Sequence, residues 1–190
     1  MKTTIHVVFA ILMVITLIAC KNQNKEIDQA TSSTEVGTTE KQGQAFIEGD
    51  VAKPNALQIA IGSPDHTTLV AAVQAAQLEN ALVNAGPLTV FAPTNNAFNA
   101  LPEGTVENLL KPENKDALAN ILKYHVTPGN LSKDFLKRFK KLGQANNLDV
   151  LVEVTNGEPI IGGAKIIASV PAGNGIVHVI DKVLLPPTNE

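Results

Sequence analysis

The chain is poor in the residues that often stabilise small exported domains. Cys20 is the single cysteine among 190 residues, which excludes an internal disulfide. Tryptophan is absent and aromatic residues make up 4% of the chain, so an ordinary core must come from the abundant Ala, Val, Leu and Ile. The net charge is only −3, and loss of Lys2 with an export signal would leave 14 basic and 18 acidic residues. This balance gives no overall bias toward nucleic acid.

Residues 1–19 have the features of an export signal. Lys2 supplies a basic start, an apolar run follows, and the run ends directly before Cys20. Such a run is too short to span the ~30 Å hydrocarbon core of a bilayer comfortably as a permanent helix. We therefore predict that residues 1–19 are a signal peptide.

Leu17 at the third position before Cys20, with Ala19 immediately before it, resembles the lipobox of bacterial lipoproteins. The resemblance implies that Cys20 carries lipid such as palmitate and anchors the chain to a membrane. The alternative is that Cys20 is a small apolar residue at the end of an ordinary signal peptide or an uncleaved anchor. Lys21 is not the aspartate that favours inner-membrane retention in some bacteria. We expect a cell-envelope location in the outer membrane, facing either the periplasm or the outside.

A polar segment separates Cys20 from the rest of the chain. Residues 21–53 are rich in Asn, Gln, Thr, Ser, Glu and Gly, and such a segment cannot bury enough apolar surface to fold. A flexible coil of about thirty residues has an end-to-end distance on the order of 30 Å. We expect a lipidated cysteine and flexible tether at 20–53, one folded domain at 54–187 and a short tail at 188–190.

Helices precede hairpins in the folded domain, which predicts an α+β class. Thr94 is placed to cap a helix, and Asn156-Gly157 to form a hairpin turn. The expected helices span residues 55–61, 67–84, 95–101, 106–110, 114–125 and 132–142. The expected strands span residues 88–92, 148–155, 159–161, 164–170 and 176–185.

Three blocks of this domain resemble the fasciclin domain family. They are residues 88–98 (LTVFAPTNNAF), 121–126 (ILKYHV) and 175–186 (GIVHVIDKVLLP), and residues 65–69 resemble the start of the first long helix of that family. The resemblance covers about residues 55–187. It implies a wedge of short strands with helices on its sides. It also implies a role in adhesion to matrix, to a cell surface or to neighbouring cells.

Two histidine sites lie within these blocks. His178 stands among apolar residues of an expected strand, so we interpret it as a structural residue with hydrogen-bonded nitrogens rather than a ligand or base. Thr94 and Asp181 are assigned to the same structural motif. Tyr124 and His125 match a Tyr-His region that is discussed as a receptor contact, for example for integrins, in animal relatives. Neighbours on a helix point about 100° apart, so at most one is expected to face the core, and we expect His125 to be an internal hydrogen-bonding residue.

Five cations fall within nine residues, and they are Lys133, Lys137, Arg138, Lys140 and Lys141. On a helix that turns Phe135, Leu136 and Phe139 inward, most of these cations would project outward as a positive patch. One interpretation is a solvated helix face. The other is a docking patch for anionic polysaccharide, lipid headgroups or an acidic protein, with salt-sensitive affinity.

No motif in the chain indicates catalysis, a metal or a cofactor. His66, His125 and His178 could be combined with Asp65 or Asp181, but none has a close ligand spacing. Neither a Gly-x-Ser-x-Gly elbow nor a phosphate-binding glycine loop occurs.

We therefore predict a membrane-anchored lipoprotein that is not an enzyme and that binds matrix, polysaccharide or a cell-surface protein, but not nucleic acid. The alternative is a periplasmic small-ligand carrier or an accessory subunit of an envelope complex. A concave apolar pocket would favour that alternative.

Overall fold

The computed structural model describes residues 53–84 and 86–187. The expected signal peptide, Cys20, nearly all of the expected tether and the tail at 188–190 lie outside the described residues. All of the described residues belong to one compact unit. Within this described part, no helix is both long enough and apolar enough to cross a membrane.

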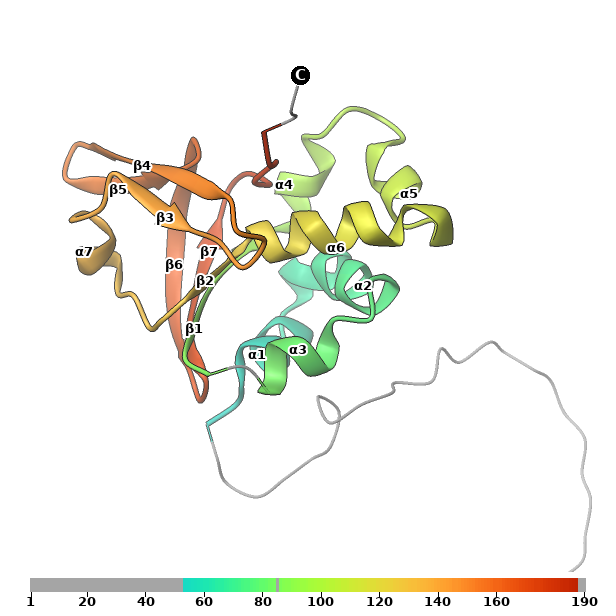
Figure 1. The fold of residues 1–190 in the computed structure, drawn as a ribbon, viewed down its shortest axis with the longest axis horizontal. Helices are drawn as coiled ribbons and strands as arrows, with labels where there is room; N and C mark the ends of the chain where they lie inside the picture. The colour runs from blue at the N-terminus through green and yellow to red at the C-terminus, as the bar shows by residue number, and fades with distance from the viewer. Residues whose placement is uncertain (1–52, 85, 188–190) are drawn as a thin grey trace, which may run out of the picture. The chain divides into compact units, whose positions relative to one another are not determined.

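The described domain is α+β, as predicted, and Figure 1 shows its helices gathered largely on one side of the strands β1 and β7. The helices are α1 (Ala56–Ile61), η2 (Pro64–His66), α2 (Thr67–Ala75), α3 (Glu79–Asn84), α4 (Asn95–Asn99), α5 (Thr105–Leu109), η3 (Pro112–Asn114), α6 (Lys115–Tyr124) and α7 (Lys133–Leu136). The strands are β1 (Leu88–Pro93), β2 (Val126–Pro128), β3 (Lys141–Gly143), β4 (Asp149–Thr155), β5 (Glu158–Ile161), β6 (Ala164–Ala172) and β7 (Gly175–Ile180).

Side-chain caps explain where several short helices begin. Asn55 and Gln58 form a reciprocal capping box at the start of α1. Thr94 accepts a hydrogen bond from the backbone amide of Ala97 at 3.3 Å and caps α4. These contacts satisfy amides that have no partner inside the helix, so short helices form directly after extended segments.

The strands form one seven-stranded sheet in the order β2-β1-β7-β6-β5-β4-β3. β1 and β7 pair in parallel, and the other described pairs are antiparallel. Asn156 and Gly157 both have positive φ and make the predicted two-residue turn between β4 and β5. The two outer strands, β2 and β3, also approach one another: the amide of Ala145, two residues after β3, donates to the carbonyl of Val126 in β2 at 2.7 Å. The sheet is therefore strongly curled.

Two apolar clusters lie on opposite sides of the central strands. Leu57, Val73 and Leu122 belong to the helical cluster, and Leu136 and Ile161 belong to the cluster inside the curled sheet. The central strands supply both clusters, with Ala92 and Val177 in the first and Phe91 and Ile180 in the second. Burial on both faces is the physical reason for their nearly continuous apolar sequence.

The expectation of one helix over residues 67–84 is wrong. The chain leaves the helix after Ala75, Gln77 adopts a φ of 56°, and α3 starts at Glu79. The amide of Leu78 bonds the carbonyl of Val73 at 3.1 Å, and the amide of Gln77 bonds that of Gln74 at 3.0 Å. This is the bonding pattern of a Schellman helix end.

The expected helix over residues 132–142 is also wrong. α7 ends at Leu136, and Leu142 lies instead in β3, opposite Val150 of β4. Leu136 and Leu142 are both buried, but Phe135 is 39% exposed, so the expectation that Phe135 turns inward fails. The apolar spacing of residues 135–142 fits a helix locally. Residues 141–143 form β3 instead, because pairing with β4 satisfies their backbone hydrogen bonds and buries Leu142.

Candidate functional site

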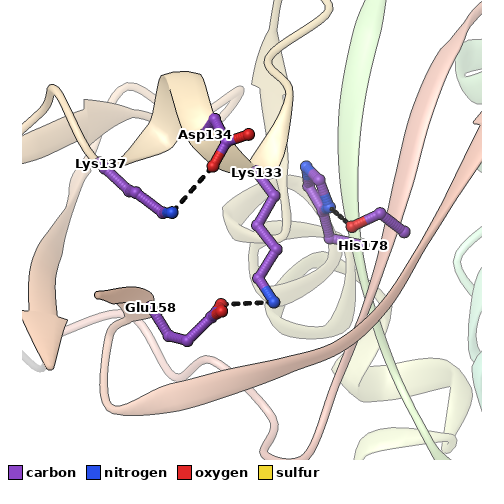
Figure 2. A network of polar contacts seen from close by, with 6 residues as sticks. Lys133, Asp134, Lys137, Glu158 and His178 are labelled. Carbon is purple, nitrogen blue, oxygen red and sulfur yellow. Dashed lines mark hydrogen bonds and ion pairs between the residues drawn. The ribbon is translucent and has the colours of Figure 1, made fainter. Parts of the chain in front are cut away.

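The five cations predicted to share one helix face are divided by the structure into two groups. Lys133 and Lys137 belong to or adjoin α7, and each has a carboxylate partner (Figure 2). Lys133 Nζ lies 2.5 Å from Glu158 Oε2, and Lys137 Nζ lies 2.8 Å from Asp134 Oδ1. The hydrogen bond raises the pKa of Lys137 and lowers the pKa of Asp134. The charges of these two lysines are thus locally matched.

Arg138, Lys140 and Lys141 form the second group, which we call the basic segment. All three are exposed, and no carboxylate of residues 53–84 or 86–187 forms an ion pair with them. The guanidinium of Arg138 lies 5.4 Å from the ring centroid of Phe135, within cation–π range. The basic segment therefore combines three free cations with one partly exposed aromatic ring.

Lys141 is the first residue of β3, which is the last strand in the order of the sheet. Lysine on an outer strand also discourages pairing with strands of other molecules. This structural role accounts for a lysine at one or two positions of the strand. It does not account for Arg138, which precedes the strand and contacts Phe135.

Tyr124 and His125 both point into the interior, so the expectation that at most one of them faces the core is wrong. Their exposed fractions are 5% and 3%. α6 ends at Tyr124 and His125 is its C-terminal cap with a non-helical backbone, so the two neighbouring side chains enter different parts of the interior. The hydroxyl of Tyr124 donates to the carbonyl of Asp149 at 3.0 Å, and burial raises its pKa.

The hydrogen bonds of His125 determine its tautomer. The backbone amide of Leu184 donates to Nε2 at 2.9 Å, so Nε2 carries no proton. Nδ1 lies 2.8 Å from the carbonyl of Ile121 and donates to it. Burial lowers the pKa of His125 to about 4, against the opposing effect of the bond to Ile121. His125 is thus neutral and has no nitrogen left for a ligand.

His178 is fully buried in β7 and also uses both ring nitrogens. Nε2 donates to the carbonyl of Leu131 at 2.9 Å, and the hydroxyl of Ser169 donates to Nδ1 at 2.7 Å, the contact drawn beside His178 in Figure 2. Burial is the main cause that lowers the pKa of His178, and the positive charge of Lys133 acts in the same direction. The ring also stacks on Phe91 with centroids 5.9 Å apart.

Thr89 belongs to the same polar network and was not singled out from the sequence. Its fully buried hydroxyl donates to the carbonyl of Gly129 at 2.7 Å and accepts from the amide of Leu131 at 2.9 Å. A threonine inside an otherwise apolar strand was the available signal, because a buried hydroxyl requires a partner. Thr89 and His178 together fasten the loop before α7 to the central strands.

The remaining candidate residues do not converge on one site. His66 Nδ1 contacts Ser63 Oγ at 2.8 Å, and burial lowers the pKa of His66. The carboxylate of Asp181 accepts a hydrogen bond from the amide of Lys165 at 2.7 Å. Within residues 53–84 and 86–187, no three His, Cys, Asp or Glu side chains form a group that could hold a metal ion.

Comparison with known proteins places this geometry in a family. Protein sll1483 of a Synechocystis species is 45% identical over 154 residues, which cover 80% of this chain and 85% of the relative. Immunogenic protein MPB70 of Mycobacterium bovis is 34% identical over 155 residues, which cover 76% of this chain and 75% of that protein. Transforming growth factor-beta-induced protein ig-h3 of Sus scrofa is 42% identical over 144 residues, but this match covers only 20% of that larger protein.

A solved FAS1 domain pair from the insect cell adhesion molecule Fasciclin I has the same fold. The TM-score is 0.62 at 19% identity, and the match covers 70% of this chain and 51% of the insect chain. The fasciclin domain model matches residues 64–186, a range that contains most of the strands and helices described above. The chain therefore belongs to the fasciclin domain family.

Proposed function

We propose that the chain is a lipid-anchored cell-envelope protein whose fasciclin domain mediates adhesion, through binding to a surface or matrix. Family membership supports this proposal, and the structural neighbour with the same fold comes from an insect cell adhesion molecule. His125 and His178 support a binding role over catalysis, because both use their ring nitrogens within the fold.

The observation that carries the proposal is the basic segment. Arg138, Lys140 and Lys141 expose three cations within four positions, and no carboxylate of the described residues pairs with them, in a chain with a net charge of −3. A local positive patch on a protein of negative net charge favours encounter with an anionic surface through that patch. The guanidinium of Arg138 can bind carboxylate, sulfate or phosphate in a bidentate manner.

The partner that we propose is an anionic polysaccharide or an acidic matrix or cell-surface protein. Phe135 adds an apolar surface beside these cations, and sugar rings and apolar protein side chains can both pack against it. Each domain would bind weakly, because exposed ion pairs contribute only about 0.2–1 kcal/mol each. Lipid anchors at Cys20 would place many domains on one membrane, and linkage would raise their effective concentration.

The experiment is a binding assay on the producing cells and on polysaccharide extracted from them, across a salt series. The test variant carries Arg138→Glu, Lys140→Glu and Lys141→Glu. A matched control carries Lys111→Glu, Lys165→Glu and Lys182→Glu, which change the net charge equally at three exposed positions away from the basic segment.

We expect saturable binding that weakens with salt, and about tenfold weaker binding by the test variant than by the control. Both variants must retain the thermal unfolding transition of the original protein. Equal weakening in both variants would assign the effect to net charge, and absence of binding by the folded original protein would reject adhesion through this surface.

The lipid anchor is tested separately at Cys20, which lies outside the described residues. Cys20→Ser is expected to abolish incorporation of labelled palmitate and to move the protein from the membrane fraction to the soluble fraction. Treatment of intact cells with protease then tests whether the domain faces outward. A domain that is protected on intact cells cannot contact another cell.

A further inference from the structure

A cavity of about 190 Å³ lies between the helices and the central strands, on the side opposite to the cluster inside the curled sheet. Its walls come from seven elements, and representative residues are Ala60 of α1, Val73 of α2, Leu82 of α3, Val90 of β1, Leu122 of α6, Val126 of β2 and Val177 of β7. The cavity is partly open to solvent and is lined almost entirely by apolar side chains. Concave apolar pockets are where small molecules usually bind, so this one requires an explanation.

The polar groups around the cavity are already bonded within the protein. His125 uses both ring nitrogens, for Ile121 and Leu184. Asn174 accepts from the amide of Ala56 at 2.9 Å and donates to the carbonyl of Leu82 at 2.8 Å, so it ties α1 and α3 to the turn before β7. A water molecule needs two to four polar partners and finds almost none here.

Among the described residues that line the cavity, Lys123 is the one with a charged side chain. Its side chain is exposed, so its ammonium group can remain in water while its methylene groups border the opening. The interior itself presents mostly aliphatic side chains. These surfaces favour an uncharged ligand with no hydrogen-bonding group in its buried part.

We propose that this cavity binds a small, uncharged apolar molecule, of the size of one aromatic ring with a short alkyl chain or a branched hydrocarbon of similar volume. The volume supports this size, because dry apolar cavities of about 150 Å³ bind benzene. This function goes beyond adhesion and uses none of the residues of the basic segment. Failure of one proposal would therefore leave the other unaffected.

The test uses the full-length protein with carbon-13-labelled alanine methyl groups, and n-butylbenzene and benzene as probes. Ala56 and Ala60 line the cavity, whereas Ala71 of α2 is exposed and lies outside it. We expect saturable one-to-one shifts of the Ala56 and Ala60 resonances with unchanged Ala71, and a rise in Tm as either probe is added.

Two variants fill the cavity from different walls. Ala60→Leu places a larger side chain on α1, and Ala81→Leu does so on α3. We expect each to lose the probe-induced shifts and the probe-induced rise in Tm, while Ala71→Leu retains both. The Tm of each variant without probe reports whether it is folded.

Absence of saturable shifts in the original protein would overturn the proposal. Binding that survives in both folded cavity-filling variants would overturn it as well. If octanoate, a charged probe of similar length, bound more tightly than n-butylbenzene and lost this advantage in Lys123→Gln, the assignment to an uncharged ligand would be rejected.

Discussion

His125 accepts a hydrogen bond from the backbone amide of Leu184, with 2.9 Å between Nε2 and the amide nitrogen. The residues are 59 positions apart in the chain. Leu184 is itself buried, and it follows β7 in a segment that belongs to no strand or helix. One imidazole ring thus attaches the C-terminal segment of the described domain to the end of α6.

Removing this ring is expected to destabilise the whole domain. His125→Ala leaves the buried amide of Leu184 without an acceptor and opens space in the interior, and together these effects should cost about 2–4 kcal/mol. Urea unfolding followed by circular dichroism measures the loss. Lys123→Ala, at an exposed position two residues earlier, serves as the matched control and should change stability by less than about 0.5 kcal/mol.

The same pair of variants separates folding from recognition at the Tyr-His region. Because Tyr124 and His125 are buried, we expect any loss of binding in His125→Ala to follow the folded fraction of the protein. Binding measured per folded molecule should remain unchanged. Loss of binding by a fully folded His125 variant would contradict this expectation.

Stability is expected to fall as the pH decreases from about 6.5 to about 4. The pKa of His125 is lowered to about 4 in the folded protein, whereas the unfolded chain binds the proton near 6.5. Between these values the unfolded state binds more protons, so the free energy of unfolding rises with pH. The full difference corresponds to about 3 kcal/mol for this residue.

The measurement is urea unfolding at half-unit steps of pH. His66 and His178 also have lowered pKa values through burial, so they contribute a slope of the same sign. The contribution of His125 is therefore the difference between the original protein and His125→Gln, which should shrink as the pH approaches 4. A constant difference across this range would show that His125 does not titrate as proposed.

The sequence was most informative where one local rule acted alone. Thr94 is a cap whose residue type and place in the chain are enough to predict a helix start, and Asn156-Gly157 predicts its turn in the same way. Family resemblance predicted the fold as a whole, since three separated blocks together specify the central strands and the helix that leads into β2. The family match and the structural neighbour confirm that prediction.

Prediction failed where contacts distant in the chain decide the conformation. Gln77 ends α2 in a position that usually holds glycine, so the sequence carried no visible stop signal. Leu142 has the spacing of a helix residue but pairs with Val150 across the sheet. The cluster of five cations was found by composition, but its separation into Lys133 and Lys137, which are paired, and the basic segment depends on where Glu158 and Asp134 lie.

Two glycines with positive φ should differ sharply in their tolerance of alanine. Gly175 has a φ of 149°, and a Cβ added there would lie 1.8 Å from the carbonyl oxygen of Leu88, its partner in the parallel pairing of β1 and β7. Gly163 has a φ of 81°, but a Cβ added there would meet no atom within 4 Å. Backbone strain acts at both sites, whereas a backbone collision acts only at Gly175.

Gly163→Ala should therefore cost about 1–2 kcal/mol, the strain of a left-handed residue. Gly175→Ala must separate the start of β1 from β7, and we expect a loss of about 4 kcal/mol or more, a magnitude that single substitutions reach only rarely. Urea unfolding and amide hydrogen exchange of β1 measure the two effects. Similar losses in both variants would mean that β1 shifts at little cost, and the parallel pair would then not be the rigid centre of the fold.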